Sequence, residues 1–129
     1  MHGERNLDRL LADLDVQRRD GVYTFVTGVW PELEREAHAT IVEAEGQTYV
    51  VTVDDARRAG ATVEFEAAWL TLTVNSSLEA VGLSAATSGI LADAGIACNM
   101  IAGFHHDHLL IPVDRADEAI GLLRGLSSR

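Results

Sequence analysis

The chain has 129 residues, of which 47% are apolar and 23% charged, and its formal net charge is −10. This acidity argues against binding to nucleic acid or to an anionic membrane surface, because both need clustered cations. All ten cationic side chains are arginine, which excludes chemistry that requires a lysine, such as a Schiff base. The single cysteine excludes an intrachain disulfide and indicates a reducing compartment, so we expect a cytoplasmic protein.

The first part of the chain predicts a helix followed by a strand. Residues 7–14 carry leucines at positions i, i+3, i+4 and i+7, which is typical of an amphipathic helix, and Asn6 is its expected N-cap. Asp20 and Gly21 predict a turn. The β-branched and aromatic residues 22–27 then predict a strand.

A hairpin and a short helix follow an acidic surface loop. Ala39–Glu43 and residues 48–53 predict two strands joined by a tight turn. Asp54 is the expected N-cap of a helix that ends at Gly60. Residues 63–74 then predict one long strand whose amino-acid composition changes near its middle.

The second half predicts two helices that alternate with strands. Residues 83–94 predict a helix, and residues 96–102 and 109–113 predict two strands across a turn. Asp114 is the expected N-cap of a last helix at residues 115–126. The apolar residues of this helix share one face, and they are Ala116, Ala119, Ile120 and Leu123.

The two halves are related by an internal repeat at a constant offset of 60 residues. Val53, Asp54, Ala56 and Ala59 are identical to the residues at that offset, and the same order of elements precedes each block. The second half reads βαββα, the split βαβ pattern of a ferredoxin-like sandwich without its final strand, which we expect the first half to supply. The sequence therefore predicts an α+β protein of two fused ferredoxin-like units, residues 1–66 and 67–129. We expect antiparallel sheets with the helices packed on one face, and residues 63–74 shared between the two units.

Three stretches of the second half resemble a known family. Residues 76–86 contain the loop before the helix predicted at residues 83–94 and the start of that helix. Residues 91–96 (Leu-Ala-Asp-Ala-Gly-Ile) contain its end, and residues 106–112 lie in the hairpin that follows. These stretches resemble the ACT domain, and in particular a bacterial group of free-standing tandem ACT proteins of unassigned ligand. That group is related to the ACT halves of eukaryotic arginine-sensing proteins. The resemblance covers residues 69–123 well, whereas residues 6–60 match mainly in the order of their elements.

The resemblance implies a regulatory module that binds a small-molecule effector, such as an amino acid, and regulates a partner enzyme. It implies neither catalysis nor a cofactor. In ACT domains the effector lies against the loop between the first strand and the first helix, often at an interface between two units, so a homodimer is expected. The implied ligand-binding residues lie in this loop and on the following hairpin: Ser76, Ser77, Leu78, Val81, Gly82, Leu83, Ser84, Asn99, Met100, Ile101, Asp107 and His108.

The same loop predicts an anion site on physical grounds. Gly82 lets the backbone approach a ligand closely, and the N-terminus of the helix at residues 83–94 offers unpaired amides and the positive end of its dipole. The alternative is that Gly82 only permits a tight turn from strand to helix. Asn99 also has two interpretations, either a ligand for the effector or a structural amide among buried neighbours.

Three histidines at the hairpin predict an alternative function. On a strand, His106 and His108 would share one face, and together with His105 they could bind a metal. The segment supplies fewer ligands than a metal site needs, and in the resemblance Asp107 and His108 match the family pattern. Cys98 lies in an apolar strand without a nearby cation, so we expect it to be buried and unreactive. The alternatives to an effector-binding protein are a metal-binding protein or metal-dependent enzyme, and a purely structural assembly module.

Overall fold

The computed structural model describes residues 3–128, which form two compact units. The first unit contains the chain up to Asp20 together with the chain from Ala68 onward, and the second contains Gly21–Ala67. One long strand, β1 (Val16–Gly28), begins in the first unit and continues in the second. Of the helices within residues 3–128, none is long and apolar enough to cross a membrane.

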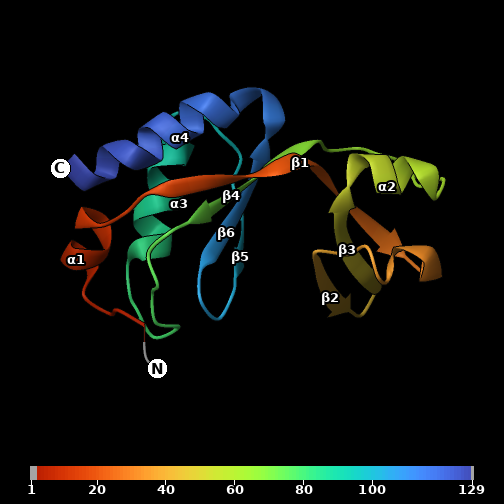
Figure 1. Cartoon of the computed structure of the whole chain (residues 1–129), viewed down its shortest axis with the longest axis horizontal. Helices are drawn as coiled ribbons and strands as arrows, with labels where there is room; N and C mark the ends of the chain where they lie inside the picture. Colours follow the sequence, from red (N-terminus) through yellow and green to blue (C-terminus); the bar gives the residue numbers. More distant parts are fainter. Residues whose placement is uncertain (1–2, 129) are drawn as a thin grey trace. The chain divides into compact units, whose positions relative to one another are not determined.

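The first unit is a layer of strands covered by helices. Its strand order is β1-β4-β6-β5, and β5 and β6 form an antiparallel hairpin in which Ala102 lies opposite Asp107. Figure 1 shows the helices α3 and α4 side by side on the same side of these strands. The elements of this unit other than β1 are α1 (Leu7–Ala12), β4 (Ala67–Leu72), α3 (Leu83–Asp93), β5 (Asn99–Ala102), β6 (Asp107–Pro112), η2 (Val113–Arg115), α4 (Ala116–Gly125) and η3 (Leu126–Ser128).

The core of the first unit forms where the apolar faces of helices and strands meet. In α3 the buried residues Leu83, Thr87 and Leu91 are spaced four apart, so they make one stripe toward the sheet. In α4 the buried Ala116, Ala119 and Leu123 are spaced three and four apart and also share one face, as the sequence pattern predicts. They pack with residues of the strands, of α1 and of the turn after α1, which include Leu10, Leu14, Leu70, Leu72, Leu109 and Ile111.

The second unit is smaller and has a separate core. Its strand order is β2-β3-β1, and the hairpin of β2 (Ala39–Glu43) and β3 (Gly46–Thr52) is confirmed. A short 3-10 helix, η1 (Pro31–Leu33), and the helix α2 (Val53–Arg58) complete it. The core residues come from β1, η1, β3, α2 and the segment just after α2: Val26, Leu33, Tyr49, Val51, Ala56 and Ala61.

Several local predictions are confirmed and others are wrong. The Asn6 side chain caps α1 by accepting a hydrogen bond from the Arg9 amide, as predicted. The turn predicted at Asp20 and Gly21 is wrong, because the strand β1 runs through both residues. The N-cap of α2 is Thr52, whose hydroxyl accepts the Asp55 amide at 3.1 Å, and not Asp54.

The shared strand is also not where the sequence pattern placed it. Only Ala67–Leu72 of the long run at residues 63–74 is a strand, so this run does not serve both units. The expectation that the first half supplies the missing strand of the βαββα pattern is confirmed, because β1 lies beside β4. The structure therefore has the predicted α+β architecture, with β1 as the element that the two units share.

Asp114 is likewise not the N-cap of the last helix. It lies inside the short 3-10 helix η2, and α4 begins at Ala116 after Arg115. Arg115 instead ties this junction to α3, since its Nη2 donates to the Ala94 carbonyl oxygen at 3.0 Å.

Candidate functional site

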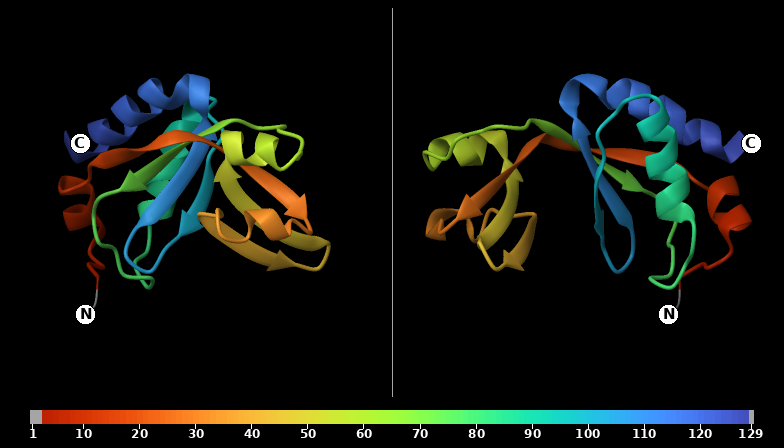
Figure 2. Two further views of the ribbon diagram at one scale, coloured as in Figure 1. Left: turned by 45° about the vertical axis from the view of Figure 1, so that its right-hand side comes forward. Right: turned by 180° about the vertical axis from the view of Figure 1, so that it is seen from behind.

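One end of the first unit gathers six of the residues that the sequence predicts as ligand-binding. The loop between β4 and α3, the first turn of α3 and the adjoining ends of β5 and β6 meet there (Figure 2). They enclose a small cavity of about 100 Å³. Its lining consists of Ser76, Ser77, Leu78, Ala80, Leu83, Ser84, Ala102 and Asp107.

The first turn of α3 lines this cavity through Leu83 and Ser84. Gly82 is the N-cap residue, with a φ of +101° and no side-chain capping bond. Ala86 donates back to the Gly82 carbonyl oxygen at 2.9 Å, which is the first bond of the helix, so the amides of Leu83 and Ser84 precede the bonded ladder. Because the positive end of the helix dipole lies at the same place, this turn suits a carboxylate.

Asp107 supplies a negative charge to the same cavity. It is half-buried at the start of β6, opposite Ala102 of β5. The cavity therefore combines backbone N–H donors from α3 with one carboxylate from β6. This pairing matches the two charges of a zwitterionic α-amino acid, whose carboxylate needs donors and whose ammonium group needs an anion.

A larger cavity of about 490 Å³ lies against the same loop. It shares Ser76, Ser77 and Leu78 with the small cavity, and its lining is completed by Gly3, Asn75, Glu79, Phe104 and His105. Gly3, Glu79 and Phe104 are not among the ligand-binding residues predicted from the sequence. For Phe104 a signal was present, since a large aromatic residue in a polar turn often marks a binding surface.

The segment that precedes α1 holds this loop in place, and we call residues 3–6 the strap. The Glu4 amide donates to the Asn75 carbonyl oxygen at 2.8 Å, and the Ser77 amide donates to the Glu4 carbonyl oxygen at 2.9 Å. These bonds make a parallel bridge between Glu4 and Ser76. A Cβ atom on Gly3 would lie 2.5 Å from the backbone of Ser76, so only glycine fits there.

The remaining predicted residues line neither cavity. Asn99 is exposed at the opposite end of β5 from Ala102, and its Nδ2 donates to the Leu110 carbonyl oxygen at 3.3 Å. The expectation of buried surroundings for Asn99 is therefore wrong. Met100 and Ile101 are half-buried within β5, and Val81 is exposed beside Gly82.

The His108 ring makes hydrogen bonds to side chains of the first unit. Trp69 Nε1–H donates to His108 Nδ1 at 3.1 Å, and Thr71 Oγ1 lies 2.9 Å from the same nitrogen. Since an indole N–H can only donate, Nδ1 is the acceptor and the ring carries its proton on Nε2. Burial lowers the pKa of His108 below its ordinary value near 6.5, and the charge of Arg19, which lies over the Trp69 ring, lowers the pKa further.

His105 and His106 do not join His108 in a metal site. His106 Nδ1 lies 3.2 Å from the Val74 carbonyl oxygen, and the His105 ring packs edge to face with Phe104. Across the described residues, no three His, Cys, Asp or Glu side chains are arranged to hold a metal ion. Cys98 is half-buried, and this burial raises the pKa of its thiol, so the thiolate is disfavoured at neutral pH.

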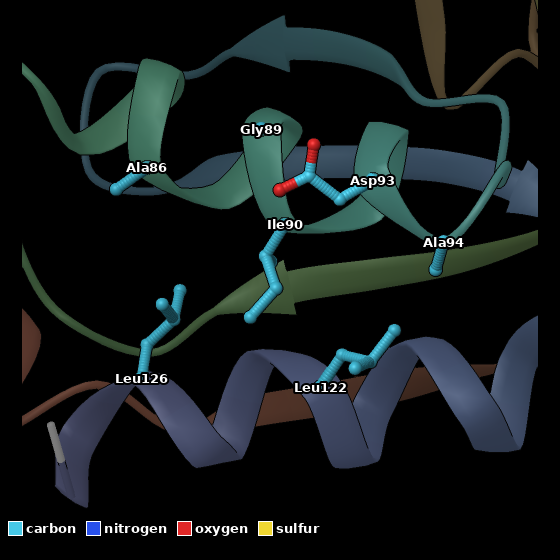
Figure 3. Close-up of a pocket in the computed structure, with 7 residues that line it drawn as sticks. All are labelled: Ala86, Gly89, Ile90, Asp93, Ala94, Leu122 and Leu126. Atoms are coloured by element: carbon cyan, nitrogen blue, oxygen red, sulfur yellow. The ribbon is translucent and has the colours of Figure 1, made fainter.

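A third cavity, of about 590 Å³, lies between α3 and α4. Figure 3 shows Ile90 of α3 extending toward Leu122 of α4, with the small residues Ala86 and Gly89 beside it. Apart from Asp93 its lining is uncharged and mostly apolar, so it lacks the paired donors and anion of the loop cavity. None of the predicted ligand-binding residues lines it.

Comparisons with known proteins agree with this architecture. Among solved structures, a protein of unknown function from Vibrio cholerae, described as a possible transport protein, is 35% identical with a TM-score of 0.84, over 94% of this chain and 95% of that one. The ligand-free regulatory subunit of aspartate kinase from Thermus thermophilus is 12% identical with a TM-score of 0.64, over 86% of this chain and 95% of that one. A protein from Agobacterium tumefaciens is 14% identical with a TM-score of 0.63, over 88% and 89% of the two chains. The last two likenesses show the fold alone.

Family comparisons identify the chain directly. No protein of curated function matches it. Two family models, both described as "ACT domain", match residues 2–68 and residues 64–125, so the two matches together span nearly the whole chain. The chain therefore belongs to the ACT domain family, as a tandem pair of ACT units.

Proposed function

We propose that the chain is a non-catalytic regulatory protein that binds a free amino acid at the loop between β4 and α3. ACT domains are regulatory modules that bind small molecules, often amino acids. The observation that supports the proposal is the small cavity that both the first turn of α3 and Asp107 line. The loop at residues 76–84 is thus the effector loop.

The size and charge of the small cavity suit the head group of an amino acid. About 100 Å³ is too small for a complete ligand, because ligand sites usually have 300–1,000 Å³, but it accommodates a carboxylate and an ammonium group. The carboxylate would accept bonds from the amides of Leu83 and Ser84, and the ammonium group would pair with Asp107. In an acidic chain without lysine, a helix N-terminus can bind an anion without a cationic side chain.

The serines of the loop support binding rather than chemistry. Ser77 Oγ accepts the Glu79 amide at 3.1 Å, which uses this hydroxyl to form the turn. Ser76 is buried beneath the strap, and its neighbours bond to Glu4. A serine nucleophile would instead need a base within hydrogen-bond reach.

The proposal is tested by a thermal-shift screen with the twenty amino acids. A ligand at 100 times its Kd adds about 2.7 kcal/mol to the free energy of unfolding, which shifts the midpoint by several degrees. We expect at least one amino acid to raise the midpoint. A flat response to all twenty at millimolar concentration contradicts the proposal.

A matched pair of variants locates the bound carboxylate. Ser84→Asp places a negative charge where the effector carboxylate would lie, yet an acidic residue in the first turn of a helix is favourable for folding. Ser84→Asn has nearly the same size without the charge. We expect Ser84→Asp to abolish binding and Ser84→Asn to retain most of it. Gly82→Asp is a poor substitute, because its Cβ would lie 2.8 Å from Leu7 and its φ is +101°.

We further propose that the repeat boundary lies near residue 67, and that the protein forms a homodimer in the cytoplasm and regulates a partner enzyme. The overlap of the two family matches at residues 64–68 supports this boundary. The exposed apolar side chain of Val81, beside Gly82, supports association with a second copy. Light scattering after size exclusion tests the dimer, and a monomer at micromolar concentration contradicts it.

A further inference from the structure

We propose that the larger cavity receives an uncharged, apolar side chain of the effector, and that an aromatic ring fits it best. This inference rests on the proposed function, because it assumes that the head group lies in the small cavity. The two cavities share Ser76, Ser77 and Leu78, so a ligand held by its head group in one has its side chain at the other. The larger cavity, of about 490 Å³, has room for any amino-acid side chain. The chemistry of its lining, and not its size, therefore selects among the amino acids.

The apolar part of the lining is unusually open to solvent. Leu78 is 65% exposed and Phe104 is 69% exposed, and they come from the effector loop and from the turn between β5 and β6. Covering a leucine or phenylalanine side chain completely favours association by about ten-fold to a hundred-fold, and partial covering contributes a share of this. A ligand side chain that contacts both residues therefore gains substantially from burial.

The charged residues of the lining contribute much less to ligand affinity than the apolar residues do. Glu79 lies at this cavity, and its carboxylate already pairs with Arg5 of the strap at 3.6 Å. Both side chains are largely exposed, so an ion pair with a basic ligand would add at most about five-fold in affinity. An acidic ligand side chain would instead be repelled by Glu79. Burial thus outweighs charge, and the comparison favours an apolar side chain.

The aromatic preference comes from the ring pair at the mouth of the cavity. Phe104 and His105 pack edge to face, with ring centroids 5.2 Å apart. A third ring can add to such a pair through further offset or edge-to-face contacts, which contribute beyond area burial. Gly3 of the strap also lines the cavity, and it contributes no side chain there.

The test compares matched ligands on the unmodified protein. Thermal shifts are measured with L-phenylalanine, L-leucine, L-alanine, L-arginine and L-glutamate at equal concentration, and affinities by calorimetry. We expect L-phenylalanine to bind at least ten-fold more tightly than L-alanine, with L-leucine between them. L-arginine and L-glutamate should bind no more tightly than L-alanine.

A pair of variants ties the preference to the cavity. Phe104→Ala should lower the affinity for L-phenylalanine at least ten-fold and leave that for L-alanine within two-fold. Val42→Ala is the control, because Val42 is 86% exposed on β2 of the other unit. Tightest binding of a charged amino acid, or L-phenylalanine binding that survives Phe104→Ala, overturns this inference and leaves the proposed function intact. A flat response to every amino acid overturns both.

Discussion

Two buried threonines allow one substitution to be tested in two environments. Thr24 of β1 and Thr87 of α3 are both fully buried. Within residues 3–128 the Thr24 hydroxyl has no hydrogen-bond partner, whereas Thr87 Oγ1 donates to the Leu83 carbonyl oxygen at 2.9 Å. Valine has nearly the same shape as threonine but lacks the hydroxyl. Thr24→Val should therefore stabilise the protein, and Thr87→Val should destabilise it.

The magnitudes follow from the two hydroxyls. A buried hydroxyl without a partner costs about 1–3 kcal/mol, so Thr24→Val should raise the free energy of unfolding by about this amount. Valine also suits a strand, and it would extend the apolar surface beside Val51, which lies opposite Thr24. Thr87→Val removes one hydrogen bond and should cost about 0.5–1.5 kcal/mol, because the Leu83 carbonyl keeps its bond within the helix. The two variants should thus differ by about 1.5–4.5 kcal/mol.

Urea unfolding followed by circular dichroism measures both variants. Tryptophan fluorescence adds local information, since Trp69 lies in the first unit with Thr87 and Trp30 in the second with Thr24. At about 2–8 °C for each kcal/mol, thermal midpoints separate the variants as well. A Thr24→Val protein that is as destabilised as Thr87→Val would refute the reasoning, because it would mean that the Thr24 hydroxyl is hydrogen-bonded in solution.

Two further predictions concern the strap and the buried histidine. Gly3→Ala should release the strap, so hydrogen exchange at the Ser77 amide should accelerate at least ten-fold, whereas Gly121→Ala, whose Cβ would meet nothing within 4 Å, should leave it unchanged. Unaltered exchange in Gly3→Ala would show that the strap does not hold the loop. Because burial depresses the pKa of His108, the unfolded chain takes up a proton first as the pH falls below about 6.5, so stability should decrease there. His108→Asn, which keeps an acceptor for Trp69, should flatten this decrease in urea titrations across pH, and an unchanged slope would contradict the assignment.

The elements predicted well from sequence are those fixed by neighbouring residues. The leucine spacing and the Asn6 cap define α1, and the turn between β2 and β3 lies within a short hairpin. The turn expected at Asp20 and Gly21 failed because long-range pairing overrides local turn chemistry: both residues lie within β1, which pairs with β3 and with β4. Likewise Thr52 and Asp54 are both good N-cap types, and only the geometry at the end of β3 selects Thr52.

The residues of the candidate site also divide into those that local sequence predicts and those that depend on contacts between distant parts of the chain. The proposed effector loop and Asp107 could be predicted from sequence, because a glycine that opens a helix and a familiar hairpin pattern lie within short segments. Gly3 could not, because it reaches the loop through a backbone bridge between Glu4 and Ser76, which are far apart in the sequence. The role of His108 was equally hidden, since its indole partner Trp69 lies 39 residues away.

The central claim is that an effector carboxylate binds at the first turn of α3. Amide chemical shifts of the isotope-labelled protein, titrated with the amino acid that gives the largest thermal shift, test it most directly. We expect the largest changes at Leu83, Ser84 and Asp107, and their loss in Ser84→Asp but not in Ser84→Asn. Changes centred instead on Ile90 and Leu122, in the groove between α3 and α4, would contradict the claim and place the ligand elsewhere in the first unit.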